Sequence, residues 1–543
     1  MSKRFPKHAA PPKVGNSAAL ISICTIISRI TGFARTWAMA FALGATFISS
    51  SYQVANNLPN MLYELVMGGM LATAFLPVYV SVKKKLGKEA SDAYASNLLT
   101  IVALLLGTVS VLCIVFSAQV IYTQSFYSEQ SEMDLAVYFF RFFAIQIVFY
   151  GASSIVSGVL NANRDYLWGA IAPVFNNLIV ITTFLLYAAV APHDQQLAFF
   201  IIAVGNPLGV FVQMAMQIPA LYHHGIRLRL RLNLHDPALR ETLSLGLPAL
   251  FVTVCSFVVV SVSNAASYTY ADNGPSVIAY SRLWFTFPYS FLAIPVATAM
   301  FTELSDLQVE GKRRGVVRGI IDGSSQIFFL MIPFMLYLIV FATPLVTLYH
   351  MGAFTEDSIG QIAGYLAVLA LALPFYGVNT YLQMVFSAIR RMGVFSGMTF
   401  AASAAQVAII MVGAWATQSG TTLPFLSQLG METIAFATFA AYAIGDVIAF
   451  IWLRAHYGAA RFTRVITACL RALGLGLLGA AAGFGVLWML QHFIGSLNGS
   501  IVQALLYTIA GGIVSLVVTF LPAIKLNLPE AAFITNLAKK LHR

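Results

Sequence analysis

Long apolar runs follow one another along almost the whole chain, separated by short polar connections. A run of about 20 apolar residues is long enough for an α-helix to cross the ~30 Å hydrocarbon core of a bilayer. The pattern therefore predicts an all-α polytopic membrane protein with fourteen transmembrane helices. The expected spans are 17–43, 51–80, 93–120, 135–160, 167–191, 196–221, 242–270, 276–302, 316–348, 358–388, 394–417, 431–453, 465–491 and 498–524.

Composition supports this interpretation. Of the 543 residues, 59% are hydrophobic and 9% are charged, whereas about 25% of the residues in a soluble protein are charged. The first sixteen residues are basic but lack the apolar segment of a signal peptide. We therefore interpret residues 1–16 as a tail that remains outside the bilayer.

The basic residues test the order of the spans. Lys and Arg cluster in every second connection, as in Lys83–Lys88 and Arg227–Arg240, and the intervening connections contain none. Cytoplasmic loops of membrane proteins carry such an excess of Lys and Arg. We therefore expect both termini to be cytoplasmic. The net charge of +11 then reflects topology and contact with anionic membrane lipid, not a nucleic-acid partner.

A weak internal repeat suggests how the helices are grouped. Residues 72–79 end the second expected span and residues 297–304 end the eighth; both begin Ala-Thr-Ala and lead into a basic cytoplasmic loop. Parallel repeats of this kind build two-lobed transporters. The predicted organisation is a cytoplasmic tail (1–16), an N-lobe of helices 1–6 (17–222), a cytoplasmic linker (223–240), a C-lobe of helices 7–12 (241–457), helices 13 and 14 (458–524) and a cytoplasmic tail (525–543), with the lobes related by a pseudo-twofold axis.

Motifs of catalysis and cofactor binding are missing from the sequence. No HExxH, GxSxG or Walker-type phosphate loop occurs, and the cysteines lie in apolar runs without CxxC spacing, as expected for buried thiols. The chain is therefore expected to be neither an enzyme nor a metal- or cofactor-binding protein. Transport would use an ion gradient, the membrane potential or downhill flow of substrate.

Two arginines lie inside the first expected span. Arg29 falls near the middle of the bilayer, where a charge costs roughly 2.5–3.5 kcal/mol, and Arg35 follows six residues later. Six residues turn a straight helix by about 600°, so the two side chains would point about 120° apart unless the helix bends at Gly32. Guanidinium groups that face a polar cavity suit a phosphate-bearing substrate; alternatively, buried acids such as Glu64 neutralise them.

Further polar residues lie in other expected spans. In the second, Pro59 should bend or break the helix, Asn60 is a candidate cavity residue, and Glu64 is a candidate partner of an arginine or carrier of a proton. In the eighth, Arg282 precedes Pro288 and is interpreted as a third phosphate ligand or an outer gate; the alternative is snorkelling to the interface.

Two polar residues of the C-terminal half have open interpretations. Asn264 is expected to form interhelical hydrogen bonds and is also a possible coupling residue. Asp446 is a possible ion or proton site, or a partner of Arg454 or Arg471.

Several of these motifs together resemble the MurJ (MviN) family of lipid II flippases, in the multidrug/oligosaccharidyl-lipid/polysaccharide exporter superfamily. The likeness covers roughly the first 400 residues. The motifs are Ser28–Arg35, Leu58–Asn60, Gly69–Pro77, Gly158–Tyr166 with Ala172–Asn176, and Arg282–Leu283 with Ala297–Thr298 and Leu304–Ser305.

The resemblance implies a cationic cavity between two lobes that rock between inward-open and outward-open states. It implies lipid II, an undecaprenyl-diphosphate-linked peptidoglycan precursor, as the substrate, moved from the inner to the outer leaflet of the bacterial cytoplasmic membrane. Arg29, Arg35 and Arg282 match family arginines that hold the diphosphate, and Asn60 and Tyr63 are added as candidate contacts. The glycine-rich stretch Gly474–Gly485 would permit close packing of helix 13.

The chain also departs from the family pattern. Serines at 49–51 replace a usual acid, and Tyr63 and Glu64 stand where a further arginine is usual. Coupling would then rest on Glu64, Asn264, Asp446 or the membrane potential, with a cation as a possible partner. The alternatives are a flippase for another polyprenyl-diphosphate-linked glycan and a non-transporting scaffold that recruits cell-wall synthesis proteins.

Overall fold

The computed structural model describes six stretches of the chain. They are residues 14–65, 75–128, 133–423, 425–458, 462–497 and 499–531, with side chains described there except at 14–22, 240–249 and 427. Within these stretches the regular structure is helical and contains no β-strand. Most of the two expected tails, and the part of the internal repeat at residues 72–74, lie outside them.

The chain divides into two compact units. Unit 1 comprises the residues up to Ala38, Leu62–Val115 and Phe142–Leu247, and unit 2 comprises Met39–Met61, Phe116–Arg141 and the residues from Pro248 onward. Three long helices, α1 (Val14–Leu43), α2 (Phe47–Tyr63) and α11 (Pro237–Ser267), begin in one unit and end in the other.

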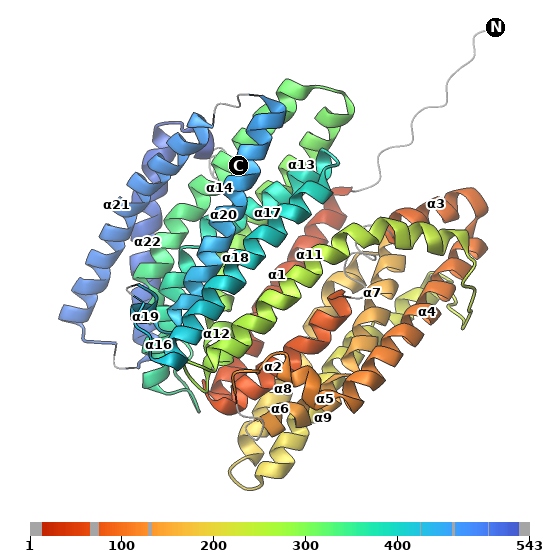
Figure 1. Ribbon diagram of the computed structural model, residues 1–543, viewed down its shortest axis with the longest axis horizontal. Helices are drawn as coiled ribbons and strands as arrows, with labels where there is room; N and C mark the ends of the chain where they lie inside the picture. The colour runs from red at the N-terminus through yellow and green to blue at the C-terminus, as the bar shows by residue number, and fades with distance from the viewer. Residues whose placement is uncertain are drawn as a thin grey trace. The chain divides into compact units, whose positions relative to one another are not determined.

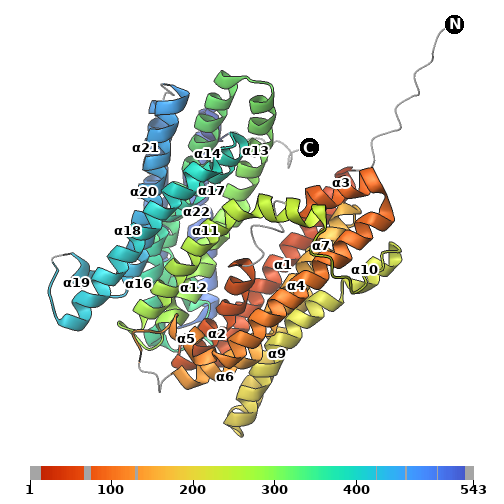
Figure 2. The same cartoon turned by 45° about the vertical axis from the view of Figure 1, so that its right-hand side comes forward.

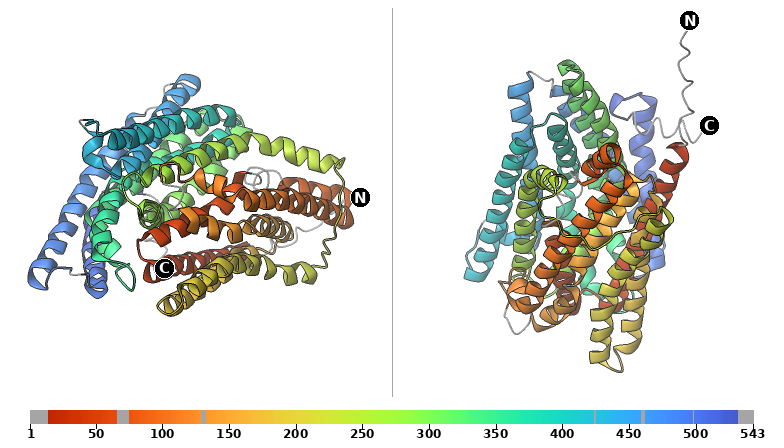
Figure 3. Two further views of the ribbon diagram at one scale, coloured as in Figure 1. Left: turned by 60° about the horizontal axis from the view of Figure 1, so that its bottom comes forward. Right: turned by 90° about the vertical axis from the view of Figure 1, so that its right-hand side faces the viewer.

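Unit 1 is a group of packed helices. In it α8 and α9, drawn in yellow shades, run side by side (Figure 3). The turn between them ends at Asp194, whose carboxylate accepts a hydrogen bond of 3.0 Å from the Leu197 backbone N–H and so caps α9. The other helices are α3 (Leu76–Leu86), α4 (Lys88–Val115), α7 (Gln146–Ala162), α8 (Leu167–Val190), α9 (Gln195–Ala215) and α10 (Ile218–His223), with the end of α6 (Asp134–Phe143).

Unit 2 holds the longer part of the chain. In it α18 lies beside α20 (Figure 2) and α21 beside α22 (Figure 1). Its further elements are α5 (Ser117–Tyr122), α12 (Gly274–Pro288), the π-helical turn η4 (Tyr289–Ala293), α13 (Ile294–Val309), α14 (Arg313–Val340), α15 (Ala342–Thr347), α16 (Glu356–Ala370), α17 (Leu373–Ala388), α18 (Met392–Ser419), α19 (Leu426–Leu429), α20 (Glu432–Tyr457), α21 (Thr463–Phe493), α22 (Ile501–Lys525) and the 3₁₀ turn η5 (Pro529–Ala531).

Small residues bring α21, α22 and α14 close together. A Cβ atom added at Gly479 would lie 2.0 Å from Thr519 Oγ1 of α22, and one added at Gly483 would lie 2.0 Å from Ser515 Oγ. The Tyr337 hydroxyl of α14 donates to the Ser515 carbonyl over 3.1 Å. Small residues at helix interfaces permit such close backbone approach in membranes. The expected close packing therefore occurs at Gly479 and Gly483, whereas a Cβ atom added at Gly474 or Gly485 would meet nothing within 4 Å.

The described residues contain eleven helices that are long and apolar enough to cross a membrane, or twelve if the bent pair α16–α17 counts as one span. These twelve coincide with the third to fourteenth expected spans. The first two expected spans are not among them, and part of the second, residues 66–74, lies outside the described residues. The all-α polytopic fold is confirmed, whereas the count of fourteen is not.

The tenth expected span, 358–388, is not one straight helix. Helices α16 and α17 meet at an angle of 48°, with Pro374 in the first turn of α17. Proline lacks a backbone N–H and disfavours helical geometry in the residue before it. Such breaks are hard to place from hydropathy alone, because the apolar run continues through them.

Two helix turns, one in each unit, share an unusual backbone. Arg164 after α7 and Arg390 after α17 have left-handed φ angles of 63° and 56°. In both turns the next N–H bonds to a carbonyl five residues earlier: Asp165 to Leu160 over 3.0 Å, and Arg391 to Phe386 over 2.8 Å. These bonds close the helix ends. The two turns are 226 residues apart, close to the offset of the repeat in the sequence.

Candidate functional site

The arginines of α1 lie in unit 1. Helix α1 is continuous from Val14 to Leu43, so the backbone around Gly32 is helical. Arg29 is exposed and makes no ion pair with any described residue, and Arg35 is half-buried. Since six residues separate them, the side chains leave the helix about 120° apart. Both guanidinium groups are therefore carried by one rigid element.

Helix α1 is held against α8 between these arginines. Asn177 of α8 donates to the Thr31 hydroxyl over 3.1 Å and to the Ser28 carbonyl over 3.4 Å. A Cβ added at Gly32 would lie 3.7 Å from Asn177 Nδ2, an ordinary contact distance. Asn177 thus fixes the segment that carries Arg29 and Arg35, as expected for an intramembrane asparagine.

The end of α2 carries the next group of candidates. Helix α2 continues through the buried Pro59 and ends at Tyr63, so it does not break at the proline. In membrane helices in general, nearby polar groups satisfy the backbone atoms that a proline leaves without a partner. Asn60 and Glu64 are exposed, and both have contacts within the protein. The Tyr63 ring lies 5.9 Å from that of Tyr150.

Arg282 lies on α12 of unit 2, and its side chain is exposed. Its charge is close enough to the phenol rings of Tyr365, Tyr376 and Tyr442 to interact with them. The Tyr376 ring lies 5.2 Å from Tyr442. Tyrosine offers an aromatic face and a hydroxyl. Arg282 therefore lies within electrostatic range of a group of tyrosines from α16, α17 and α20, called the tyrosine cluster below.

The helix that carries Arg282 changes its winding at the expected hinge. Helix α12 ends at Pro288 and is followed by the π-helical turn η4 before α13 begins at Ile294. Tyr289 of η4 packs on Tyr376 with ring centroids 4.4 Å apart. Single π turns often occur at functional sites. Pro288 thus stands at an irregular point of the helix, two turns from Arg282.

Asp446 of α20 is a buried carboxylic acid. Its side chain is 1% exposed, and its Oδ1 accepts a hydrogen bond of 3.0 Å from Asn379 Nδ2 of α17. Its Oδ2 has no hydrogen-bond partner among the described residues. The hydrogen-bond partner of Asp446 is thus Asn379 rather than Arg454 or Arg471. Arg471 instead pairs with Glu530 over 3.0 Å.

Asn264 belongs to a bonded group of uncharged residues. It is 4% exposed and donates to Gln124 Oε1 over 2.8 Å. Gln124 in turn donates to the Ser261 hydroxyl over 2.5 Å. Asn264 therefore joins α11 to the turn after α5, so its partner lies outside a helix and the expected interhelical hydrogen bond is not the one observed.

The serines that replace the usual acid form a buried contact. Ser49 and Ser50 of α2 both reach the hydroxyl of Ser276 on α12, with 2.8 Å between the Ser50 and Ser276 oxygens. All three residues have 0% exposure. Tyr280 donates to the Gly44 carbonyl over 2.8 Å beside them. In this chain the position holds uncharged residues in a dry contact, rather than a carboxylate that faces a cavity.

Sequence reasoning missed the tyrosine cluster at Arg282. Tyr365, Tyr376 and Tyr442 come from three helices distant in sequence, and each lies alone among apolar residues. The detectable signal was the tyrosine content of the chain, 23 residues, which does not single these out. Arg29, Arg35, Tyr63 and Glu64 belong to unit 1, whereas Asn60, Asn264, Arg282 and Asp446 belong to unit 2.

Comparison with known proteins gives one consistent family. The family model described as "Lipid II flippase MurJ" matches residues 39–503. Arg282 lies inside the matched residues, and Arg29 and Arg35 precede them.

Curated relatives carry the same description. A "Lipid II flippase MurJ" of Burkholderia cenocepacia is 29% identical over 361 residues, which are 65% of this chain and 69% of the relative. A "Probable lipid II flippase MurJ" of Rhizobium meliloti is 26% identical over 499 residues, which are 85% of this chain and 91% of the relative.

Solved structures share the fold. One described as "Lipid II flippase MurJ, inward closed conformation" has a TM-score of 0.73 at 19% identity and covers 94% of this chain and 99% of its own. An inward-facing multidrug resistance transporter of the MATE family, in the MOP superfamily, has a TM-score of 0.66 at 14% identity, with 82% and 99% covered.

Proposed function

Because the chain belongs to the lipid II flippase MurJ family, it is a membrane lipid II flippase of peptidoglycan biosynthesis, and we propose that Arg29, Arg35 and Arg282 bind the diphosphate of the substrate. It is a transporter and not an enzyme. We further propose that transport runs from the inner to the outer leaflet of the bacterial inner membrane, with both termini cytoplasmic.

The charge of Arg282 is the observation that supports this proposal most directly. It is exposed on a membrane-spanning helix and stands beside tyrosines, with no carboxylate partner among the described residues. An uncompensated guanidinium group in a membrane is costly, and a diphosphate that binds its planar fork in two places offsets that cost. The tyrosine hydroxyls add uncharged donors for the same oxygens or for the attached sugar.

The arginines of α1 would supply the second part of the clamp. Arg29 and Arg35 lie on one continuous helix that Asn177 holds in place, so a rigid movement of α1 would carry both charges together. Asn60 and Tyr63, at the end of α2, are proposed as further contacts to the substrate.

We propose two six-helix lobes, 17–222 and 241–457, that alternate the access of this site. The left-handed turns at Arg164 and Arg390, with their equal hydrogen-bond patterns, support the repeat. Gly32, Pro59 and Pro288 are proposed as the points where helices bend. Among them Pro288 has direct support, because it is followed by a π-helical turn.

The driving force is proposed to include the membrane potential. An interior-negative potential favours outward movement of an anion by about 2.3 kcal/mol per charge per 100 mV. Asp446, Glu64 and Asn264 are proposed as the groups that would add coupling to a cation or proton. Asp446 has the strongest support, because its Oδ2 is buried and unpartnered among the described residues.

The test is lipid II flipping by the purified protein in liposomes. Wild-type protein should flip lipid II and should do so faster when an interior-negative potential is imposed. Arg29→Ala should abolish flipping while the protein still inserts. Flipping by Arg29→Ala at the wild-type rate would refute the diphosphate clamp. If the protein flips a different polyprenyl-diphosphate glycan in preference to lipid II, that glycan is its substrate.

A further inference from the structure

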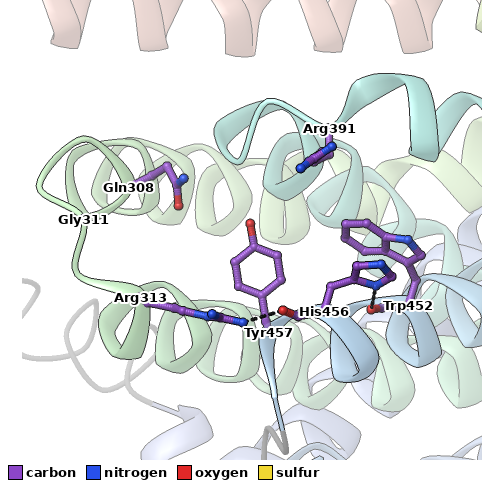
Figure 4. A pocket seen from close by; sticks show the side chains of 7 residues that line it. All are labelled: Gln308, Gly311, Arg313, Arg391, Trp452, His456 and Tyr457. Carbon is purple, nitrogen blue, oxygen red and sulfur yellow. Dashed lines mark hydrogen bonds between the residues drawn. The ribbon is translucent and has the colours of Figure 1, made fainter.

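Unit 2 contains a cavity that takes no part in the proposed clamp. It has a volume of about 330 Å³ and lies where the α13–α14 turn, the α17–α18 turn and the end of α20 meet (Figure 4). Arg313, Arg391 and His456 line it, and no carboxylate does. The neighbouring Glu310 forms an ion pair of 2.7 Å with Lys312 instead.

Of these three residues, Arg313 and His456 are held in place by the protein. Arg313 donates from Nη2 to the His456 carbonyl, and its guanidinium carbon lies 5.4 Å from the centre of the Tyr457 ring. The His456 ring stacks on Trp452 at 4.1 Å, and its Nδ1 donates to the Trp452 carbonyl over 3.0 Å. Arg391 points toward the same space from the opposite side (Figure 4) and has no ion pair with any described residue.

Two helices begin at this cavity and add to its positive potential. Helix α14 starts at Arg313 and α18 starts after Arg391; each is 28 residues long, and neither has a side-chain hydrogen bond at its N-cap. The first N–H groups of a helix lack partners within it and favour anions. Some of these N–H groups already have backbone partners, such as Arg313 with the Gly311 carbonyl and Val394 with the Arg391 carbonyl. The lining therefore attracts an anion chiefly through the two guanidinium groups and the helix dipoles.

Unit 1 has a similar arrangement of residues, but there a carboxylate of the protein, that of Asp165, is the anion. Lys88, at the start of α4, donates to the His224 carbonyl over 2.9 Å, as Arg313 donates to that of His456. The His224 ring pairs with Asp165 over 2.9 Å. Asp165 follows the left-handed Arg164 just as Arg391 follows the left-handed Arg390. Where unit 1 has an acid, unit 2 has a guanidinium group.

We propose that the unit 2 cavity binds a phosphate group, which takes the place that the Asp165 carboxylate occupies in unit 1. The phosphate could come from the headgroup of an anionic lipid or from the surrounding solution. Val309 and Ile451, 83% and 63% exposed, follow Gln308 and precede Trp452 of the lining. Exposed apolar side chains next in sequence to the lining residues favour a lipid source, whose chains would contact this end of the helices.

The site can be tested without transport, by thermal unfolding of the full-length protein in detergent. The probes are inorganic phosphate, short-chain phosphatidylglycerol and short-chain phosphatidylcholine, with chloride at equal ionic strength as the reference. Phosphate or phosphatidylglycerol should raise the unfolding temperature more than chloride or phosphatidylcholine does. A response to phosphatidylglycerol alone identifies a lipid headgroup, and a response to phosphate alone identifies the soluble ion.

Arg391→Asp places an aspartate where unit 1 has Asp165. This variant should bind the active probe at least tenfold more weakly, which is about the effect of losing one charged hydrogen bond. Arg314→Asp is the matched control, because Arg314 is exposed beside Arg313 but does not line the cavity, and it should bind as the wild type does. If Arg391→Asp does not fold, Arg391→Gln removes the charge with little change in size. Equal binding by the wild type and the Arg391 variants, or no response of the wild type to either anionic probe, overturns the proposal.

Discussion

Asn379 Nδ2 donates a hydrogen bond of 3.0 Å to Asp446 Oδ1 between α17 and α20. The acid is almost completely buried, and its other oxygen has no partner among the described residues. A buried carboxyl group that loses such a contact retains the full cost of its removal from water. The pair therefore offers a way to separate stability from coupling.

Asn379→Leu should lower the free energy of unfolding by about 1–3 kcal/mol, because Asp446 then lacks its amide donor. Denaturant unfolding in detergent measures the change. Asn379→Gln, which keeps an amide, should restore part of the loss. Unchanged stability of Asn379→Leu would show that the hydrogen bond contributes little.

Asp446→Asn should keep the fold, since its side-chain oxygen still accepts from Asn379. If Asp446 carries a proton during transport, this variant should flip lipid II at least tenfold more slowly, and its rate should no longer vary with pH. Liposome assays at several pH values provide the measurement. A wild-type pH profile in Asp446→Asn would exclude this carboxyl group from coupling.

Arg282→Ala should reduce lipid II flipping at least tenfold, because the diphosphate loses a bidentate contact. Arg282→Lys should be intermediate, since an ammonium group carries the charge without the planar fork. The rates are compared in liposomes with equal amounts of inserted protein. Arg314→Ala, which removes a positive charge elsewhere, serves as the control, and equal rates for Arg282→Ala and this control would remove Arg282 from the site.

Gly479→Ala should destabilise the packing of α21 on α22 by about 1–3 kcal/mol, because its methyl group would stand 2.0 Å from Thr519 Oγ1 and 2.6 Å from the Ser515 carbonyl. Gly474→Ala on the same helix meets nothing within 4 Å and should be neutral or stabilising, since alanine favours a helix. Unfolding measured side by side should show Gly479→Ala to be less stable than the wild type and Gly474→Ala to be at least as stable as the wild type.

Ser50→Asp should destabilise the protein by several kcal/mol, although it restores an acid that is usual in the family. Ser50 is fully buried against Ser276, so the new carboxylate would lie unpaired in a dry contact. Ser50→Ala should cost only about 1 kcal/mol, the contribution of one hydrogen bond. A stable and more active Ser50→Asp variant would show that this position reaches the cavity.

The sequence alone determined the class of the protein and indicated the arginines that we propose for its substrate site. Apolar length requires helices in a membrane, and the cost of an intramembrane charge makes Arg29, Arg35 and Arg282 stand out wherever they lie in the fold. Both signals are local, because each depends on residues adjacent in the chain and on the surrounding bilayer.

The tertiary structure decided which polar groups meet. It joined Asp446 to Asn379, placed Ser50 against Ser276 and brought Arg282 within electrostatic range of tyrosines from three helices. It also placed Arg391 where unit 1 has Asp165. Such contacts depend on how each helix is rotated and on breaks such as that between α16 and α17. A broken span has nearly the same hydropathy as a straight one, so hydropathy does not reveal the break. Pairing across helices therefore becomes visible only when the packed side chains are in place.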